Sequence, residues 1–142
     1  KKYQQIVKKS GMAGIYPLLL KTFCRKLNWG YRDGFDEISF IQHSFLFSMY
    51  LLNLHGNDWV PFFIYEDYFL QAFPMVTEEA MSRPHTSAEE EVRVCYSIRA
   101  LKRFLYFMGL ASIEKIPSDK PALREFRIRK LPLLDEVVRF SI

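Results

Sequence analysis

Five basic residues lie close together between positions 120 and 130, and side chains of this type neutralise the phosphates of nucleic acids. A single carboxylate, Glu125, interrupts them, so this basic stretch carries a local charge of +4, equal to the net charge of the whole chain. Phosphate contacts release counterions, and binding through these residues would therefore weaken as salt rises. The candidate contacts are Lys120, Arg124, Arg127, Arg129 and Lys130.

Four further cations lie between positions 93 and 103, on what we expect to be the solvated face of a helix. Two of them, Arg99 and Arg103, are added to the candidate nucleic-acid contacts. The start of the same helix is acidic, because residues 77–91 hold five glutamates against one arginine. Carboxylates at this end would be repelled by phosphates. The helix start therefore argues against nucleic-acid binding, whereas the basic stretch favours it.

Enzyme chemistry has little support in the motifs. The three histidines are separated by 11 and 29 residues and have no metal-ligand spacing. Glu66 and Asp67 are adjacent, and neighbouring helical side chains point about 100° apart, so we do not expect them to share a site. The sequence has no GxSxG, Walker or GxGxxG motif. We expect a protein that is not an enzyme, with no catalytic residue, metal, cofactor or small-molecule ligand.

Two cysteines, Cys24 and Cys95, lie 71 positions apart without a CxxC pair. We interpret them as reduced core thiols, which are typical of a cytoplasmic protein. The longest nearly apolar run, 45–54, is about half of the ~20 residues that a membrane span requires, so we expect no membrane partner. The chain opens on Lys1 and lacks the apolar stretch of a signal peptide; we expect a piece of a longer chain.

The clearest predicted element is a helix that begins at residue 88. Ser87 followed by Glu90 is a capping box, in which each side chain bonds to a backbone N–H at the helix start. Gly109 favours the left-handed conformation that ends helices. Apolar residues spaced by three and four predict the buried stripe: Val94, Ile98, Leu101, Leu105 and Met108.

Two short strands are predicted after this helix. Residues 110–116 form the first, and residues 117–121, with two prolines and an aspartate, form the connection. In residues 123–130 apolar and charged side chains alternate, which is the period of a half-buried strand. A short helix over 133–140 is expected to pack on the same core.

The earlier part of the chain is predicted as helices over 12–29, 38–55 and 62–73, after a frayed basic lead-in over 1–10. The helix over 38–55 is apolar nearly all round, so we expect it to be buried on more than one face. A length of 142 residues suits one domain, and an aromatic content of 16% predicts a core dominated by rings.

A cluster of polar and aromatic residues lies at 29–37, around the turn marked by Asp33-Gly34. It has two interpretations, a surface that contacts a partner or an aromatic plug between helices. The acidic helix start is a second candidate protein contact. The candidate residues for protein interaction are Trp29, Tyr31, Arg32, Phe35, Glu89 and Arg93.

From residue 38 onward, the order of elements resembles that of a winged-helix domain, with two helices, a capped third helix, a strand, a wing and a strand. The third helix corresponds to 87–109, the wing strands to 110–116 and 123–130, and the wing tip to 118–120. The resemblance implies an α+β fold, mostly helical with a C-terminal β-hairpin. Many such domains place the third helix in the major groove of DNA.

These observations favour a non-catalytic, winged-helix-like interaction or accessory module of a larger intracellular protein. We expect residues 1–37 and 38–142 to pack together as one globular unit. An acidic helix start beside a basic hairpin makes a dipolar surface, which suits a charged protein partner or a second copy of the chain. The alternative is a nucleic-acid-binding winged-helix domain that uses the basic wing.

Overall fold

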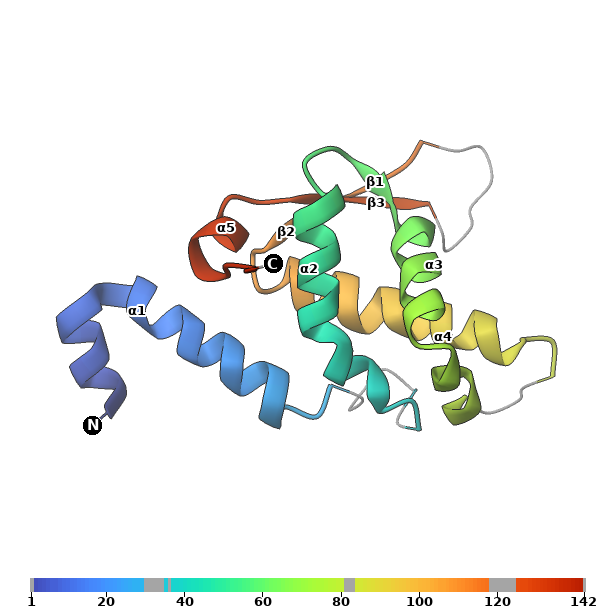
Figure 1. Cartoon of the computed structure of the whole chain (residues 1–142), viewed down its shortest axis with the longest axis horizontal. Helices are drawn as coiled ribbons and strands as arrows, with labels where there is room; N and C mark the ends of the chain where they lie inside the picture. Colours follow the sequence, from blue (N-terminus) through green and yellow to red (C-terminus); the bar gives the residue numbers. More distant parts are fainter. Residues whose placement is uncertain (1, 30–34, 36, 81–83, 118–124, 142) are drawn as a thin grey trace.

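The computed structural model describes the chain apart from residues 1, 30–34, 36, 81–83, 118–124 and 142. The first helix, α1 (Lys2–Lys26), is interrupted at Gly11, whose φ is 64° and ψ is −164°. Glycine reaches this φ at little cost because it has no Cβ. The lead-in that we expected to be frayed is therefore helical, and the two parts of α1 run in different directions (Figure 1).

The central helix is α2 (Phe45–His55), which follows a short 3₁₀ helix, η1 (Phe40–Ser44). Consecutive positions such as Leu51 and Leu52 are both buried in it. The prediction that this helix is buried on more than one face is thus confirmed. The 3₁₀ start divides what we expected to be a single helix from residue 38.

A second pair of helices packs beside α2: α3 (Phe62–Ala72) is followed by the 3₁₀ helix η2 (Pro74–Glu79), then α4 (Ala88–Tyr96) begins. Ser87 caps α4, because its Oγ accepts a hydrogen bond from the backbone N–H of Glu90 at 3.1 Å. The predicted helix start is therefore confirmed.

Helix α4 continues directly into η3 (Ser97–Tyr106), a π-helix, and Gly109 follows it with a φ of 70°. The predicted stripe assumed one α-helical period, whereas hydrogen bonds in a π-helix span five residues and turn the side chains differently. Leu101 and Leu105 are buried as predicted, but Val94, Ile98 and Met108 are only partly buried. The core is filled instead by Val92, Cys95, Tyr96, Ala100 and Phe104.

Within the described residues, three short strands form one antiparallel sheet, in the order β1-β3-β2. The hairpin of β2 (Ala111–Lys115) and β3 (Phe126–Lys130) was predicted, and Ile113 lies opposite Ile128 in it. The other edge, β1 (Val60–Pro61), was not predicted, because two residues that end in proline show no alternation.

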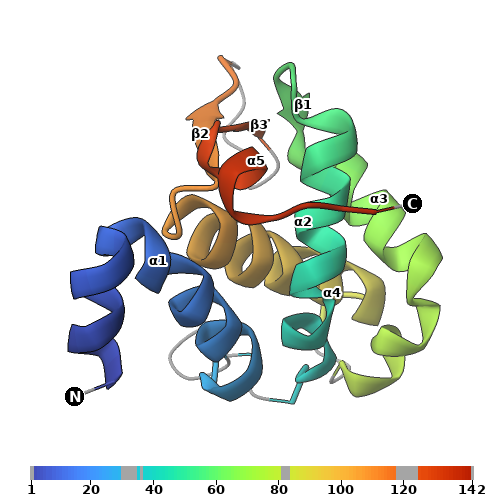
Figure 2. The same cartoon turned by 60° about the vertical axis from the view of Figure 1, so that its left-hand side comes forward.

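The sheet lies at one end of the helices, and α2 crosses the long helix made by α4 and η3 (Figures 1 and 2). The last helix, α5 (Leu133–Val137), lies beside the sheet, and the segment after it returns across α2, where the rings of Phe140 and Tyr50 are 5.5 Å apart. Stacked rings fill the centre: Phe45 on Phe104 at 4.2 Å, for example. The architecture is α+β with an aromatic core, as predicted.

Candidate interaction surfaces

Two of the predicted cations lie on the outer face of the sheet. Because strand side chains alternate, the burial of Ile128 places Arg127 and Arg129 on the opposite side. Their guanidinium carbons lie 5.3 and 4.9 Å from the ring centroid of Trp59, just before β1. Arg127 also donates a hydrogen bond to Glu114 on β2. We call Trp59, Arg127 and Arg129 the cationic sheet face.

The described residues of the basic stretch do not all lie on one face of the sheet. Lys130 lies on the same side of β3 as Ile128, and its Nζ is 2.9 Å from Oδ1 of Asp135 on α5. Lys120 and Arg124 lie outside the described residues. Trp59 was missed by the sequence analysis, because nothing in its own neighbourhood indicates that β1 pairs with the far strand β3.

Arg99 has a different role from the one expected. Its side chain is fully buried, so the prediction that it lies on the solvated face and contacts nucleic acid is wrong. The guanidinium donates hydrogen bonds to the carbonyl oxygens of Ile38 and Phe35, the second at 2.8 Å. A buried cation needs such partners, and here it fastens η3 to the chain before η1.

The remaining cations of η3 are partly buried. The Nζ of Lys102 lies 3.7 Å from the ring centroid of Phe126 on β3, and burial lowers the pKa of this amine. Arg103 is also partly buried and has an interaction partner. These residues connect the helix with its surroundings instead of forming a continuous basic strip for phosphates.

The junction of α3 and α4 contains a network around Arg93. Its guanidinium lies 2.5 Å from Asp67 and 2.8 Å from Glu89, and 3.8 Å from the nearly buried Glu66. Glu66 also accepts a hydrogen bond from the Oγ of Ser97 at 2.5 Å. Burial lowers the pKa of Arg93, but its hydrogen bonds to Glu89 and Asp67 outweigh burial and the pKa is raised.

This network corrects one expectation and extends another. Glu66 and Asp67 do share a neighbour, because the guanidinium of Arg93 lies within 4 Å of both. Glu89 and Arg93, predicted as protein contacts, are brought together as a helical pair four residues apart. The spacing of four residues predicts that pair. Nothing in the sequence indicates that Glu66 and Asp67 of α3 lie beside Arg93.

A cleft of about 470 Å³ opens over this junction. In the part of its lining that the structure describes, three carboxylates, from Asp67, Glu89 and Glu90, lie against the single guanidinium of Arg93. Phe63, with 42% of its surface exposed, adds an aromatic ring. We call this the acidic cleft; its lining residues are Phe63, Asp67, Ser87, Glu89, Glu90 and Arg93.

The aromatic loop before η1 is a plug where the structure describes it. The ring of Trp29 lies 5.2 Å from that of Phe45 and 5.7 Å from that of Phe104, in edge-on contacts. Phe35 also packs against the core. The plug interpretation is confirmed for Trp29 and Phe35, while Tyr31 and Arg32 lie outside the described residues.

The histidines lie apart from one another. His55 stacks on Tyr68 with ring centroids 4.9 Å apart, and His43 lies 6.2 Å from Phe40. Within the described residues, no three His, Cys, Asp or Glu side chains come together as a potential metal site. Both cysteines are free thiols.

No helix in the described part of the chain has the length and hydropathy needed to cross a membrane. Comparison with known proteins gives no family: no protein-family model matches the chain, and no curated protein or solved structure shows significant similarity to it.

Proposed function

We propose that the chain is a non-catalytic, winged-helix-like module that acts by binding another protein. The order of elements from α2 to β3 supports this fold: a helix, a second helix, a capped third helix and a two-stranded hairpin. In this reading α4 is the helix that a DNA-binding member would present to the major groove. The kind of partner then depends on the charge of the surface at the start of α4.

The observation that carries the proposal is the pairing of Arg93. Among the described residues this cation is the only one in the lining of the acidic cleft, and its guanidinium is held by Asp67 and Glu89. The surface at the start of α4 is therefore net acidic. Phosphates would be repelled here, whereas a basic protein segment would be attracted.

The chemistry of the acidic cleft suggests the kind of segment that it accepts. Its carboxylates suit lysine or arginine side chains, and the exposed face of Phe63 suits a cation or an apolar residue beside them. A short peptide with alternating basic and aromatic residues is the matching probe.

The test compares this peptide with a random-sequence DNA duplex by fluorescence anisotropy at about 50 and about 200 mM salt, where phosphate contacts are most visible. We expect peptide binding that Glu89→Gln with Glu90→Gln weakens. The matched control, Asp58→Asn with Glu78→Gln, removes the same charge from exposed positions elsewhere. Duplex binding at the lower salt, or equal peptide binding by both variants, would overturn the proposal.

The cationic sheet face favours a second candidate function, the binding of single-stranded nucleic acid. An aromatic ring combined with arginines is the arrangement that such proteins use for bases and backbone. Arg129 is exposed beside Trp59, although Arg127 is already paired with Glu114. Reversal of both arginines to glutamate should abolish binding of a single-stranded oligonucleotide if this function exists, and unchanged binding would exclude the cationic sheet face.

A further inference from the structure

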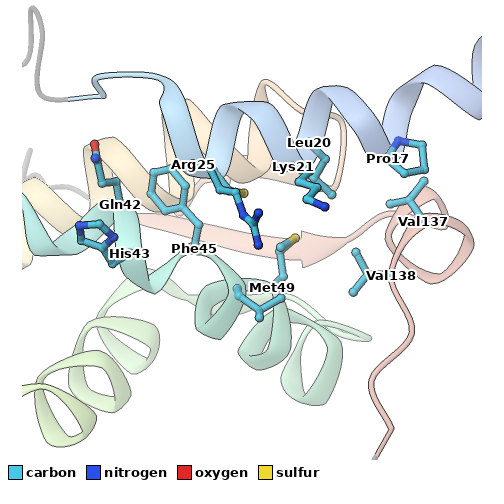
Figure 3. A pocket seen from close by; sticks show the side chains of 12 residues that line it. Pro17, Leu20, Lys21, Arg25, Gln42, His43, Phe45, Met49, Val137 and Val138 are labelled. Atoms are coloured by element: carbon cyan, nitrogen blue, oxygen red, sulfur yellow. The ribbon is translucent and has the colours of Figure 1, made fainter.

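A second opening, distinct from the acidic cleft, lies between α1 and α2 (Figure 3). It has a volume of about 440 Å³ and apolar walls, with Leu20 from α1 facing Phe45 and Met49 from α2. Val137 and Val138 close one end. We call this opening the α1–α2 slot. Its walls come from three separate parts of the chain, so the sequence gives no sign of it.

The mouth of the α1–α2 slot leaves a large apolar side chain uncovered. Leu46, in the first turn of α2, lines the slot and has 61% of its surface exposed. An occupant confined to the interior would leave this leucine in water. A partner that also lies across the mouth would bury it, which favours a macromolecular occupant over a small molecule.

The charge of the mouth is positive. Lys21 and Arg25, one helical turn apart on α1, are exposed and lie over the slot (Figure 3). In the described part of the chain, neither side chain forms an ion pair or hydrogen bond, and no acidic residue is among those that line the slot. Like charges four residues apart on a helix repel each other, so an acidic partner would relieve this repulsion.

The length of the slot matches a helix. From Pro17 to Arg25 the wall covers nine residues of α1, whose eight steps span about 12 Å at a rise of about 1.5 Å per residue. Amphipathic helices bind grooves through anchors at positions i, i+3 or i+4, and i+7, which span about two turns. We propose that the α1–α2 slot is a docking site for an acidic amphipathic helix of another protein.

A helix from a second copy of this chain does not meet the requirement. In the described part of the chain α3, α4 and α5 each carry a net charge of −2, and each buries apolar residues in its own core: Phe62 and Phe69 in α3, Val92 and Tyr96 in α4, and Leu134 in α5. The docking site rests on the proposed function, because both assume that the chain binds other proteins. It adds a second surface, opposite in charge to the acidic cleft, and therefore a second class of partner.

Cys24 provides a local reporter of occupancy. Its thiol lines the slot and is only partly buried, whereas Cys95 is fully buried. Alkylation of the folded chain should therefore occur at Cys24. A helix in the slot should slow this reaction, while a peptide bound elsewhere should not.

The experiment uses the full chain and a fluorescent peptide of about 18 residues, with leucines at i, i+3, i+4 and i+7 and glutamates between them. Anisotropy should show binding, and Cys24 alkylation should slow as the peptide is added. Lys21→Glu with Arg25→Glu should weaken binding roughly tenfold, because two attractions become repulsions. Lys8→Glu with Lys9→Glu, an equal charge change at exposed positions of α1, should have little effect.

Three results would overturn the docking site: no binding of the glutamate peptide, binding that leaves Cys24 alkylation unchanged, or equal loss in both charge variants. Circular dichroism of each variant verifies that it is folded. A peptide with lysine in place of glutamate separates the two proposals. If it binds through Glu89 and Glu90 while the glutamate peptide does not bind, the docking site fails and the proposed function stands.

Discussion

The guanidinium of Arg99 donates a hydrogen bond to the carbonyl oxygen of Phe35 at 2.8 Å, across 64 positions of sequence. A second bond reaches the carbonyl oxygen of Ile38. A side chain of η3 therefore holds the backbone at Phe35 and Ile38, just before η1. The sequence predicted that Arg99 lies on the surface, but its side chain is one of the largest fully buried side chains of the protein.

Replacement of Arg99 by methionine should destabilise the protein severely. The change keeps most of the aliphatic volume but removes the donors to two carbonyl oxygens, of which that of Ile38 is buried and that of Phe35 is partly buried. A buried carbonyl oxygen left unpaired costs about 1–3 kcal/mol. We expect a loss of about 2–4 kcal/mol in the free energy of unfolding, measured by urea denaturation. Arg139→Met, at an exposed position, serves as the control and should change it by less than about 0.5 kcal/mol. Equal effects would contradict the anchoring role.

The pair of Arg93 and Asp67 should couple weakly but measurably. Asp67 has 46% of its side chain exposed, so solvent screens the pair despite a separation of 2.5 Å. A double-mutant cycle with Arg93→Met and Asp67→Asn should give a coupling of about 0.5–1 kcal/mol, reduced by added salt. A coupling near zero at low salt would show that Arg93 does not hold α3 to α4 through Asp67.

The neighbouring bond of Ser97 to Glu66 should contribute more, because both side chains are nearly buried. Ser97→Ala removes one hydroxyl and leaves the Glu66 carboxylate without this donor. The free energy of unfolding should fall by about 1–3 kcal/mol in urea denaturation. Thr77→Ala also removes a hydroxyl that forms a hydrogen bond, but an exposed one, and should have a smaller effect.

Alkylation of Cys24 should keep accelerating well above pH 9. Burial raises the pKa of its thiol from 9.0 to about 11, and the thiolate is the reactive form. The rate should therefore rise up to about pH 11 in the folded chain and level off near pH 9 in urea. Because the unfolded chain loses this proton first, the stability that the neutral thiol contributes is complete below pH 9 and declines toward pH 11. A plateau near pH 9 in the folded chain would contradict the burial of Cys24.

Gly56 should not tolerate a side chain. A Cβ at this position would collide with the carbonyl oxygen of Leu52 and lie 3.1 Å from the Cβ of Lys130. The first neighbour is backbone and cannot move aside, so Gly56→Ala should cost about 1–3 kcal/mol in thermal or urea unfolding. Asn57→Ala, at the exposed next position, is the control. An unchanged unfolding midpoint for Gly56→Ala would mean that the C-terminal end of α2 packs less tightly against β3 than the structure shows.

The features that the sequence predicted well are those with local causes. The start of α4 at Ala88 follows from the side chain of Ser87 and the backbone of Glu90, three residues away. The pairing of β2 with β3 follows from the alternation of side chains within β3. In each case the residues that determine the structure lie within one turn or one strand.

The features that it missed depend on partners far apart in the chain. Arg99 is buried by segments about 60 positions earlier, and Trp59 meets Arg129 only because β1 pairs with β3. The α1–α2 slot also requires three separate elements to meet. The π-helical register of η3 shifts the buried face away from the α-helical period, which no count of apolar spacings anticipates.

The sheet also determines an order of events during folding. Its middle strand, β3, is the last of the three in the chain, and in the part of the chain that the structure describes both β1 and β2 pair only with β3. During synthesis the segments of β1 and β2 therefore cannot form their strand pairs until β3 (Phe126–Lys130) has left the ribosome. We expect the helices to collapse first and the sheet to form as the late, rate-limiting step, because its closure joins Val60 to Ile128, 68 positions apart in the chain.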